Sequence, residues 1–201
     1  MNIPLMMPNR GSTIRIDTAQ TIMGWQHILN QSGINLILIS AHASNIPRAR
    51  NQCMDTIRDN PSKSIFMGWM DSDMVLPTNE NTIKHLDKMA WYAHGQKDAV
   101  VCCDYRTLMA DNEFQMREYR TSGTANQELD RRKHPIFSES FTDMGYSGAS
   151  GFGLCFGYFP RDYIFHADTL GEDIHFWLDN KKTRLIRYND FVPGHAKEVI
   201  L

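Results

Sequence analysis

Apolar runs of strand length alternate with helix-length segments over the first hundred residues. The runs predict four strands, at residues 3–7, 35–40, 64–70 and 98–103. Apolar residues recur at helical spacing over residues 17–31 and 79–94, and Ser44 or Asn45 can cap a further helix that ends before Pro61. This alternation predicts an α/β fold with an open, mostly parallel central sheet of the doubly wound type.

The same patterns predict which positions are buried. The run at 35–40 is apolar at successive positions, which is typical of a strand that is covered on both faces. In the helix before Pro61, the inward stripe comprises positions 46, 49 or 50, 53 and 57. We therefore expect Arg50 to point inward and Arg48 to meet solvent.

The second half of the chain is less regular. It predicts, in order, an exposed strand at 114–119, a polar loop at 121–134, a glycine-interrupted strand at 147–159, a short helix at 171–180, a last strand at 184–188 and a turn at 193–195. Glycines within a strand indicate that its backbone closely approaches another group. No repeat or linker divides the sequence, so we expect a single domain over residues 1–201.

Composition and charge narrow the class of protein. The 201 residues, 42% of them hydrophobic, suffice for one domain with a sizeable core. The formal net charge is -2, whereas proteins that hold nucleic acid mainly by charge have an excess of positive residues. No apolar run approaches the roughly 20 residues of a membrane span, and no leader pattern opens the chain. We therefore expect a soluble, cytoplasmic protein.

The cysteines do not suggest a metal site or a redox motif. Cys53, Cys102, Cys103 and Cys155 form no Cys-x-x-Cys pair. We expect buried free thiols, as is usual in a reducing compartment.

The first candidate site is Asp71-Ser72-Asp73, which follows the strand at 64–70. Ligands bind open α/β sheets beyond the carboxyl ends of their strands. Carboxylates there suit Mg²⁺ or Mn²⁺, which take one or two of them and complete the shell with water and phosphate oxygens. The alternative interpretation is a pair of turn or helix-capping aspartates.

Two further elements carry candidate chemistry. Glu172-Asp173 opens the predicted short helix, where acidic residues are favoured by the helix dipole in any case. A carboxylate there could also act as a general base towards an acceptor hydroxyl. His195, in a Pro-Gly turn, is a reasonable ligand for Mn²⁺ or else a surface residue.

Arginines follow the first and second strands near the same sheet edge. Guanidinium groups and helix amino termini there can hold phosphates. Arg10 and Arg50 are the candidates, and Arg50 is preferred over Arg48 because it lies on the inward stripe. Solvated surface arginines are the alternative.

The order of these parts resembles the small glycosyltransferases of the GT-A fold, close to the inverting family 2 and its viral and phage members. The resemblance covers nearly the whole chain. It rests on the early PNRG turn, IPRARNQCMDTI, SIFMGWMDSDMVLP, SGASGFGLCF, GEDIHFW and the late PGHAK. It implies a single Rossmann-like domain with a nucleotide-sugar half at 1–105 and an acceptor half at 106–201.

The resemblance also implies roles for individual residues. Asp73 would be the principal metal ligand, with Asp71 assisting or contacting the nucleotide sugar and His195 completing the site. Asp173 would be the catalytic base, with Glu172 as its orienting neighbour. The remaining nucleotide-sugar contacts would be Pro8, Asn9, Arg10, Arg50, Asn51, Ser72 and Gly151.

The implied reaction is displacement at the anomeric carbon of a nucleotide-diphosphate sugar, with inversion, aided by Mn²⁺ or Mg²⁺. The donor would be a UDP-sugar, and the acceptor a glycan, a protein or a hydroxymethylated DNA base. A viral member would act in the host cytoplasm. Two alternatives stay open: a sugar nucleotidyltransferase, and a non-catalytic module that binds nucleotide sugars or carbohydrate.

Overall fold

The computed structural model describes most of the chain. The described residues are 1–9, 14–104, 106–108, 114–115, 117–122, 125–130, 139–146, 148–166 and 171–196. Within 106–130, and at 148–149 and 195–196, the description extends to the backbone only.

A seven-stranded mixed sheet forms the centre of the fold, in the order β10-β13-β5-β12-β3-β1-β2. Its strands are β1 (Asn2–Asn9), β2 (Asn35–His42), β3 (Ser64–Met70), β5 (Ala99–Cys103), β10 (Phe141–Gly145), β12 (Leu154–Pro160) and β13 (Arg184–Tyr188). The pairs β1–β2, β1–β3 and β5–β13 are parallel, whereas β12 runs antiparallel to β3 and β5, and β10 antiparallel to β13. The α/β class is confirmed.

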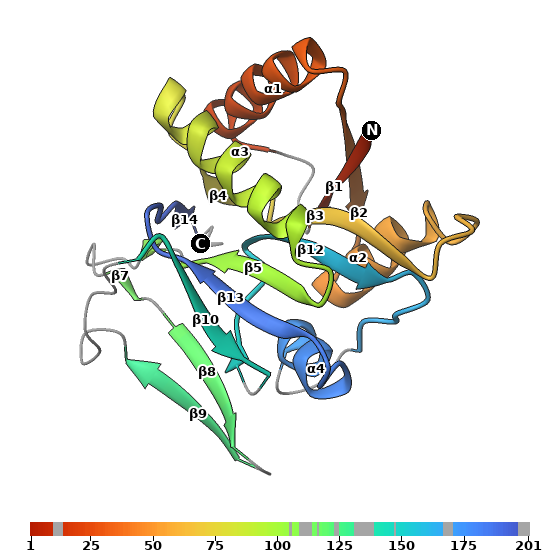
Figure 1. Cartoon of the computed structure of the whole chain (residues 1–201), viewed down its shortest axis with the longest axis vertical. Helices are drawn as coiled ribbons and strands as arrows, with labels where there is room; N and C mark the ends of the chain where they lie inside the picture. The colour runs from red at the N-terminus through yellow and green to blue at the C-terminus, as the bar shows by residue number, and fades with distance from the viewer. Residues whose placement is uncertain are drawn as a thin grey trace.

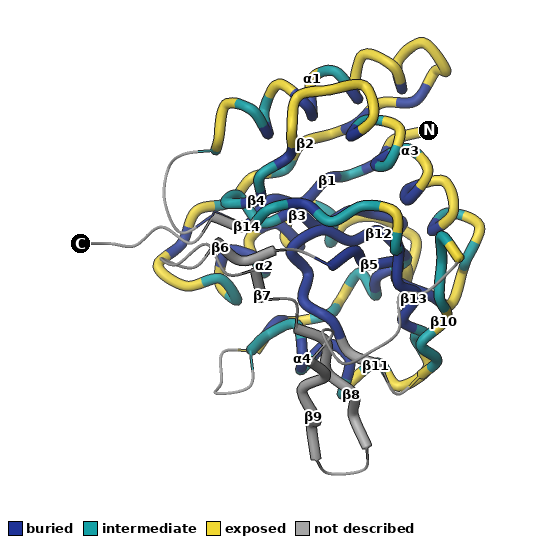
Figure 2. Tube along the Cα trace, turned by 90° about the vertical axis from the view of Figure 1, so that its left-hand side faces the viewer, coloured by how far each residue is buried: buried dark blue, intermediate teal, exposed yellow. Residues whose placement is uncertain are grey.

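Helices cover both faces of this sheet (Figure 1). They are α1 (Ile16–Gln31), α2 (Ile46–Asp55), α3 (Glu80–Gly95) and α4 (Glu172–Asp179). Alternate strand residues serve opposite faces: Leu5 and Met7 pack in the cluster that contains α1 and α3 residues, and Met6 in the one that contains α2 and α4 residues. Figure 2 shows the inner strands buried and the outer surface of α1 exposed.

The predicted helix starts are confirmed where capping residues specify them. The Asn45 side chain accepts a hydrogen bond from the Arg48 amide at 2.9 Å, and Asn79 accepts from the Thr82 amide at 2.8 Å. These side chains satisfy backbone donors that have no partner within the first turn. The inward stripe of α2 is confirmed too, because Ala49, Arg50 and Cys53 are buried.

Three predictions about strands were wrong. β2 is an edge strand, not a strand covered on both faces, and Ile37 and Leu38 are 41% and 47% exposed. Successive apolar residues do not distinguish an edge from a centre, since strand order depends on contacts distant in sequence.

The other two corrections concern short strands away from the main sheet. In the polar loop predicted at 121–134, β9 (Ala125–Asp130) pairs antiparallel with β8 (Arg117–Ser122). At the predicted turn 193–195, β14 (Gly194–Ala196) pairs with β4 (Met74–Val75) and β6 (Arg106–Leu108). Backbone hydrogen bonds between neighbouring strands form β9 and β14, and the sequence there has no apolar pattern that would predict a strand. β7 (Phe114–Gln115) and β11 (Gly148–Ala149) complete the two smaller sheets.

Close backbone approach at a strand glycine is confirmed at Gly157 in β12. A Cβ atom built there would lie 2.7 Å from the Ala99 carbonyl oxygen and 2.9 Å from the Val100 Cα. Both contacts are with the backbone of β5, which cannot move without disturbing the sheet.

We therefore expect Gly157→Ala to lower the free energy of unfolding by about 1–3 kcal/mol, the usual cost of overpacking. Urea denaturation measures the change. Gly95→Ala is the matched control, because a Cβ there meets nothing within 4 Å. Equal stability of the two variants would contradict the close packing of β12 on β5.

Candidate functional site

A buried arginine lies at the centre of the candidate site. Arg50 lies on the inward face of α2, and its side chain is 1% exposed. Rings from three segments form an aromatic box around its guanidinium carbon, at 5.1 Å from the Trp69 centroid, 5.5 Å from Phe152 and 5.8 Å from Phe165. Such cation–π contacts compensate part of the cost of removing the charge from water.

Two carboxylates that lie far apart in sequence pair with this guanidinium. Arg50 Nη2 donates to Asp71 Oδ1 at 2.9 Å, and Arg50 Nε donates to Glu172 Oε1 at 3.1 Å. Asp71 follows β3, and Glu172 is the first residue of α4. A buried charge requires such partners, because an unpaired ion in the interior is strongly destabilising. The structure therefore brings Asp71-Ser72-Asp73 and Glu172-Asp173 to one place.

Asp173 is the carboxyl group of this cluster whose pKa is raised. Burial, and after it the negative charge of Glu172, raises its pKa to about 6, while the positive charge of Arg50 opposes both effects. Its Oδ1 accepts a hydrogen bond from the Ile174 amide at 2.8 Å. A carboxylate with this pKa takes up and releases a proton close to neutral pH, as a general base must.

The segment that carries the aspartates is anchored by α1. The Thr18 hydroxyl donates to the Met74 carbonyl at 2.6 Å and accepts from the Leu76 amide at 3.2 Å. Sequence reasoning missed Thr18 and its neighbour Thr21, which contacts the Leu76 carbonyl. The only signal was two threonines three positions apart on the helix face that carries Trp25.

Asn9 and Ser72, both predicted to contact the nucleotide sugar, are brought together. The Ser72 hydroxyl donates to Asn9 Oδ1 at 3.1 Å. Asn9 and Pro8 are the buried last residues of β1. This contact joins the carboxyl ends of β1 and β3, the edge at which ligands meet such sheets.

Two other predicted contact residues lie beside the aromatic box. The segment with Gly151 is buried, and the Asp71 amide donates to the Gly153 carbonyl at 3.0 Å. The Asn51 amide group bonds the backbone of Phe165 in both directions, at 2.9 and 2.8 Å. Asn51 thus holds a wall of the box, and sequence reasoning missed Phe165 altogether because an isolated phenylalanine carries no signal.

The predicted metal ligands are only partly described. Asp71 and Asp73 are half-buried, and His195 in β14 is paired in register with Met74, the residue after Asp73. The side chain of His195 and the whole of Arg10 lie outside the described residues. Among the residues the structure does describe, no three His, Cys, Asp or Glu side chains group as a metal site.

A second buried arginine lies in β13 and pairs with the aspartate that follows β5. Arg187 Nε donates to Asp104 Oδ2 at 2.7 Å, and both side chains are 4% exposed.

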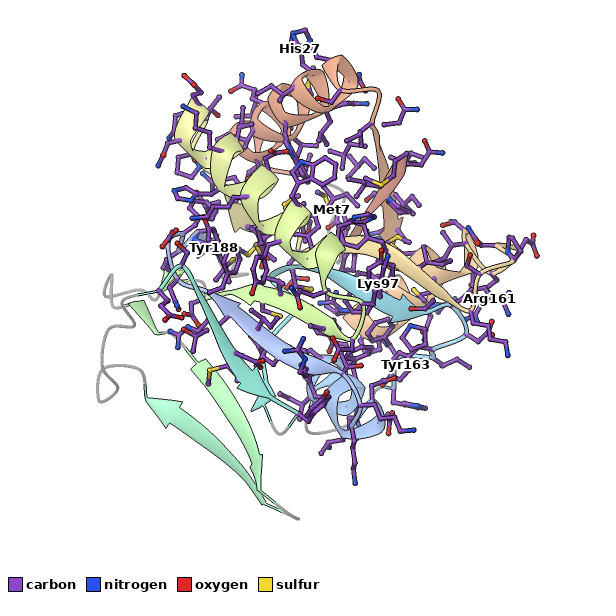
Figure 3. The ribbon with its side chains drawn as sticks, viewed as in Figure 1. Met7, His27, Lys97, Arg161, Tyr163 and Tyr188 are labelled. Atoms are coloured by element: carbon purple, nitrogen blue, oxygen red, sulfur yellow. The ribbon has the colours of Figure 1, made fainter. Side chains whose placement is uncertain are left out.

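Elsewhere, the Tyr163 hydroxyl donates to Asp179 at the far end of α4, and Tyr188 contacts His85 of α3 (Figure 3). All four cysteines are buried free thiols, as predicted.

Comparison with known proteins identifies no family. No protein-family model matches the chain, and no curated protein matches it significantly. Within the described residues, no helix is long and apolar enough to cross a membrane.

The raised pKa of Asp173 predicts how stability depends on pH. An unfolded aspartate titrates near about 3.9, so between that value and about 6 the folded state binds more protons than the unfolded state. Stability contributed by this group is therefore lost as the pH rises through that window. An asparagine side chain carries no charge at any pH, so Asp173→Asn should be more stable than wild type by roughly 1–3 kcal/mol at about pH 7 and equal to it below about pH 4.

Urea denaturation at both pH values measures this difference. Asp59→Asn is the control, because Asp59 is exposed. A variant at position 173 that is no more stable than wild type at neutral pH would contradict a buried, charged Asp173.

Proposed function

We propose that the protein is a metal-dependent glycosyltransferase that moves a sugar from a nucleotide-diphosphate sugar to an acceptor hydroxyl. The observation that carries this proposal is the junction at Arg50. One guanidinium joins the aspartate segment after β3 to the Glu172-Asp173 pair of α4. A transferase needs a place for the diphosphate and a base for the acceptor side by side, and we propose that these two elements would serve as both.

The residues present fit a hard divalent cation. Carboxylate oxygens suit Mg²⁺ and Mn²⁺, and such ions are commonly held by one or two carboxylates plus substrate phosphates. Asp71 and Asp73 would hold the ion, and His195 is a further candidate through its place beside Met74. When bound, the ion would neutralise charge that develops on the departing diphosphate.

Asp173 would act on the acceptor. In its ionised form it takes the proton of the acceptor hydroxyl while that oxygen forms a bond to the anomeric carbon. The bond between the anomeric carbon and the diphosphate oxygen breaks, and the nucleoside diphosphate leaves with the electron pair. Attack opposite the leaving group inverts the anomeric configuration. A UDP-sugar as donor and a glycan, protein or modified DNA base as acceptor remain the proposals to be tested.

Asp173→Asn tests the base. We expect it to lower kcat by about 10²–10⁴-fold, the usual contribution of a general base, and to leave donor binding intact because Asp71 and Asp73, not Asp173, would hold the ion. Calorimetry and slow donor hydrolysis over a panel of UDP-, GDP- and dTDP-sugars measure the two quantities. The exposed Asp59→Asn serves again as control. Equal turnover by wild type and Asp173→Asn would leave a binding module as the better description.

Asp73→Ala tests the metal site in the same assays. We expect loss of the dependence of donor binding on added Mn²⁺, because the variant lacks the principal carboxylate ligand. Binding that is independent of Mn²⁺ in wild type would contradict this role. Absence of binding to every nucleotide sugar in the panel would overturn the proposed function itself.

A further inference from the structure

We propose that Arg50 is the positioning residue of this site rather than a phosphate ligand. Its guanidinium fixes the Asp71 carboxylate at the end of β3 relative to the Glu172 carboxylate at the start of α4, and so determines where Asp173 lies relative to the sugar donor. This inference rests on the proposed function and deepens it. It also revises the sequence-based role, because the side chain is 1% exposed and two of its nitrogens already donate to carboxylates of the protein.

The geometry of the two contacts requires a guanidinium. Different nitrogens serve the two carboxylates, Nη2 at 2.9 Å for Asp71 and Nε at 3.1 Å for Glu172. These nitrogens belong to one rigid plane, so the angle between the two hydrogen bonds is set by covalent structure. The single ammonium of a lysine imposes no such angle.

The guanidinium is itself held in place from several directions. Trp69 comes from β3, Phe152 from the segment before β12, and Phe165 is fixed by the amide of Asn51, the next residue of α2. A positioning group must have its own rotamer fixed by packing. The rings and the Asn51 contact meet that requirement.

Asp173 depends on this link through α4. The helix has eight residues, and its N-cap is Gly171, which has φ +91 and supplies no side-chain cap. A Cβ at Gly171 would lie 3.1 Å from Asp173 Oδ1, so the base is packed against the start of its own helix. The Arg50–Glu172 contact ties that start to α2, while Trp177 Nε1 donates to the Ser150 carbonyl further along the helix.

The expected contribution of the Arg50 ion pairs to stability also supports a positioning role. Burying an ion pair rarely stabilises a fold more than apolar residues of similar volume would. Here the guanidinium lies among aromatic rings, where an apolar residue could pack without the cost of desolvation. A buried arginine at this position is therefore better explained by the orientation it imposes than by the stability it adds.

Arg50→Lys is the decisive variant, tested in the whole chain with the donor found in the panel. We expect kcat to fall by about 10²-fold, the cost of misplacing a reacting group by about 1 Å, with the donor Kd unchanged. Arg48→Lys, exposed on the same helix, should alter neither quantity.

A double-mutant cycle shows whether Arg50 acts through Glu172. Glu172→Leu removes the acceptor of the Nε hydrogen bond, whereas Glu172→Gln keeps an oxygen there, so we expect a larger loss of kcat for leucine. If both residues form one link, Arg50→Lys combined with Glu172→Leu should be no slower than the slower single variant. If Arg50→Lys does not fold, the comparison of the leucine and glutamine variants carries the test.

The outcomes separate this assignment from the proposed function. Arg50→Lys with normal kcat and weakened donor binding would restore the phosphate role and overturn the positioning role. Loss of stability with kcat unchanged would leave Arg50 with a structural role only. A wild-type chain that neither binds nor turns over any nucleotide sugar would instead overturn the proposed function on which this inference rests.

Discussion

Burial of the Arg50 charge is the constraint on which the arrangement of this site depends. A guanidinium removed from water must have its donors satisfied by groups that can reach it. Here Nη2 and Nε donate to carboxylates at the end of β3 and the start of α4, so pairing the charge fixes two distant parts of the chain relative to each other. Nη1 has no hydrogen-bond partner among the described residues. The aromatic rings around the guanidinium keep its side chain 1% exposed, and the low dielectric there strengthens its contacts with the carboxylates.

The order of strands makes this junction possible. β12 runs antiparallel between β3 and β5, so the chain that enters it passes the point where β3 ends. Residues 151–153 therefore meet Asp71 through the bond from its amide to the Gly153 carbonyl, and Phe152 reaches Arg50. Glycines permit the approach, most clearly at Gly68 and Gly157, where a Cβ would collide with Phe156 or with β5. A purely parallel sheet would not deliver this segment to the aspartates.

Local signals predicted much of the fold but not the contacts between distant segments. An inward stripe with Ser44 or Asn45 as cap located α2, the helix predicted at 79–94 corresponds to α3, and apolar runs located β1, β3 and β5. The exposed edge position of β2 and the strands β9 and β14 could not be predicted, because pairing partners decide them and no local pattern encodes those partners.

For the site, spacing predicted that Arg50 points inward, but it could not show that Asp71 and Glu172, 21 and 122 positions away, would be its partners. Periodicity along one element specifies a face, and only tertiary packing specifies what that face meets. The roles taken from the resemblance to GT-A glycosyltransferases stay predictions.

Burial and the charges around Asp173 together set its pKa. Arg50 donates hydrogen bonds to Asp71 and Glu172, whereas Asp173 accepts one from the Ile174 backbone. Burial and the nearby Glu172 charge disfavour its ionised form, and the charge of Arg50, more than the Ile174 amide, limits the rise of the pKa to about 6. The guanidinium that sets the geometry of the carboxylates therefore also sets the proton affinity of the proposed base. Position and protonation cannot be tuned independently at this site, because both depend on one buried side chain.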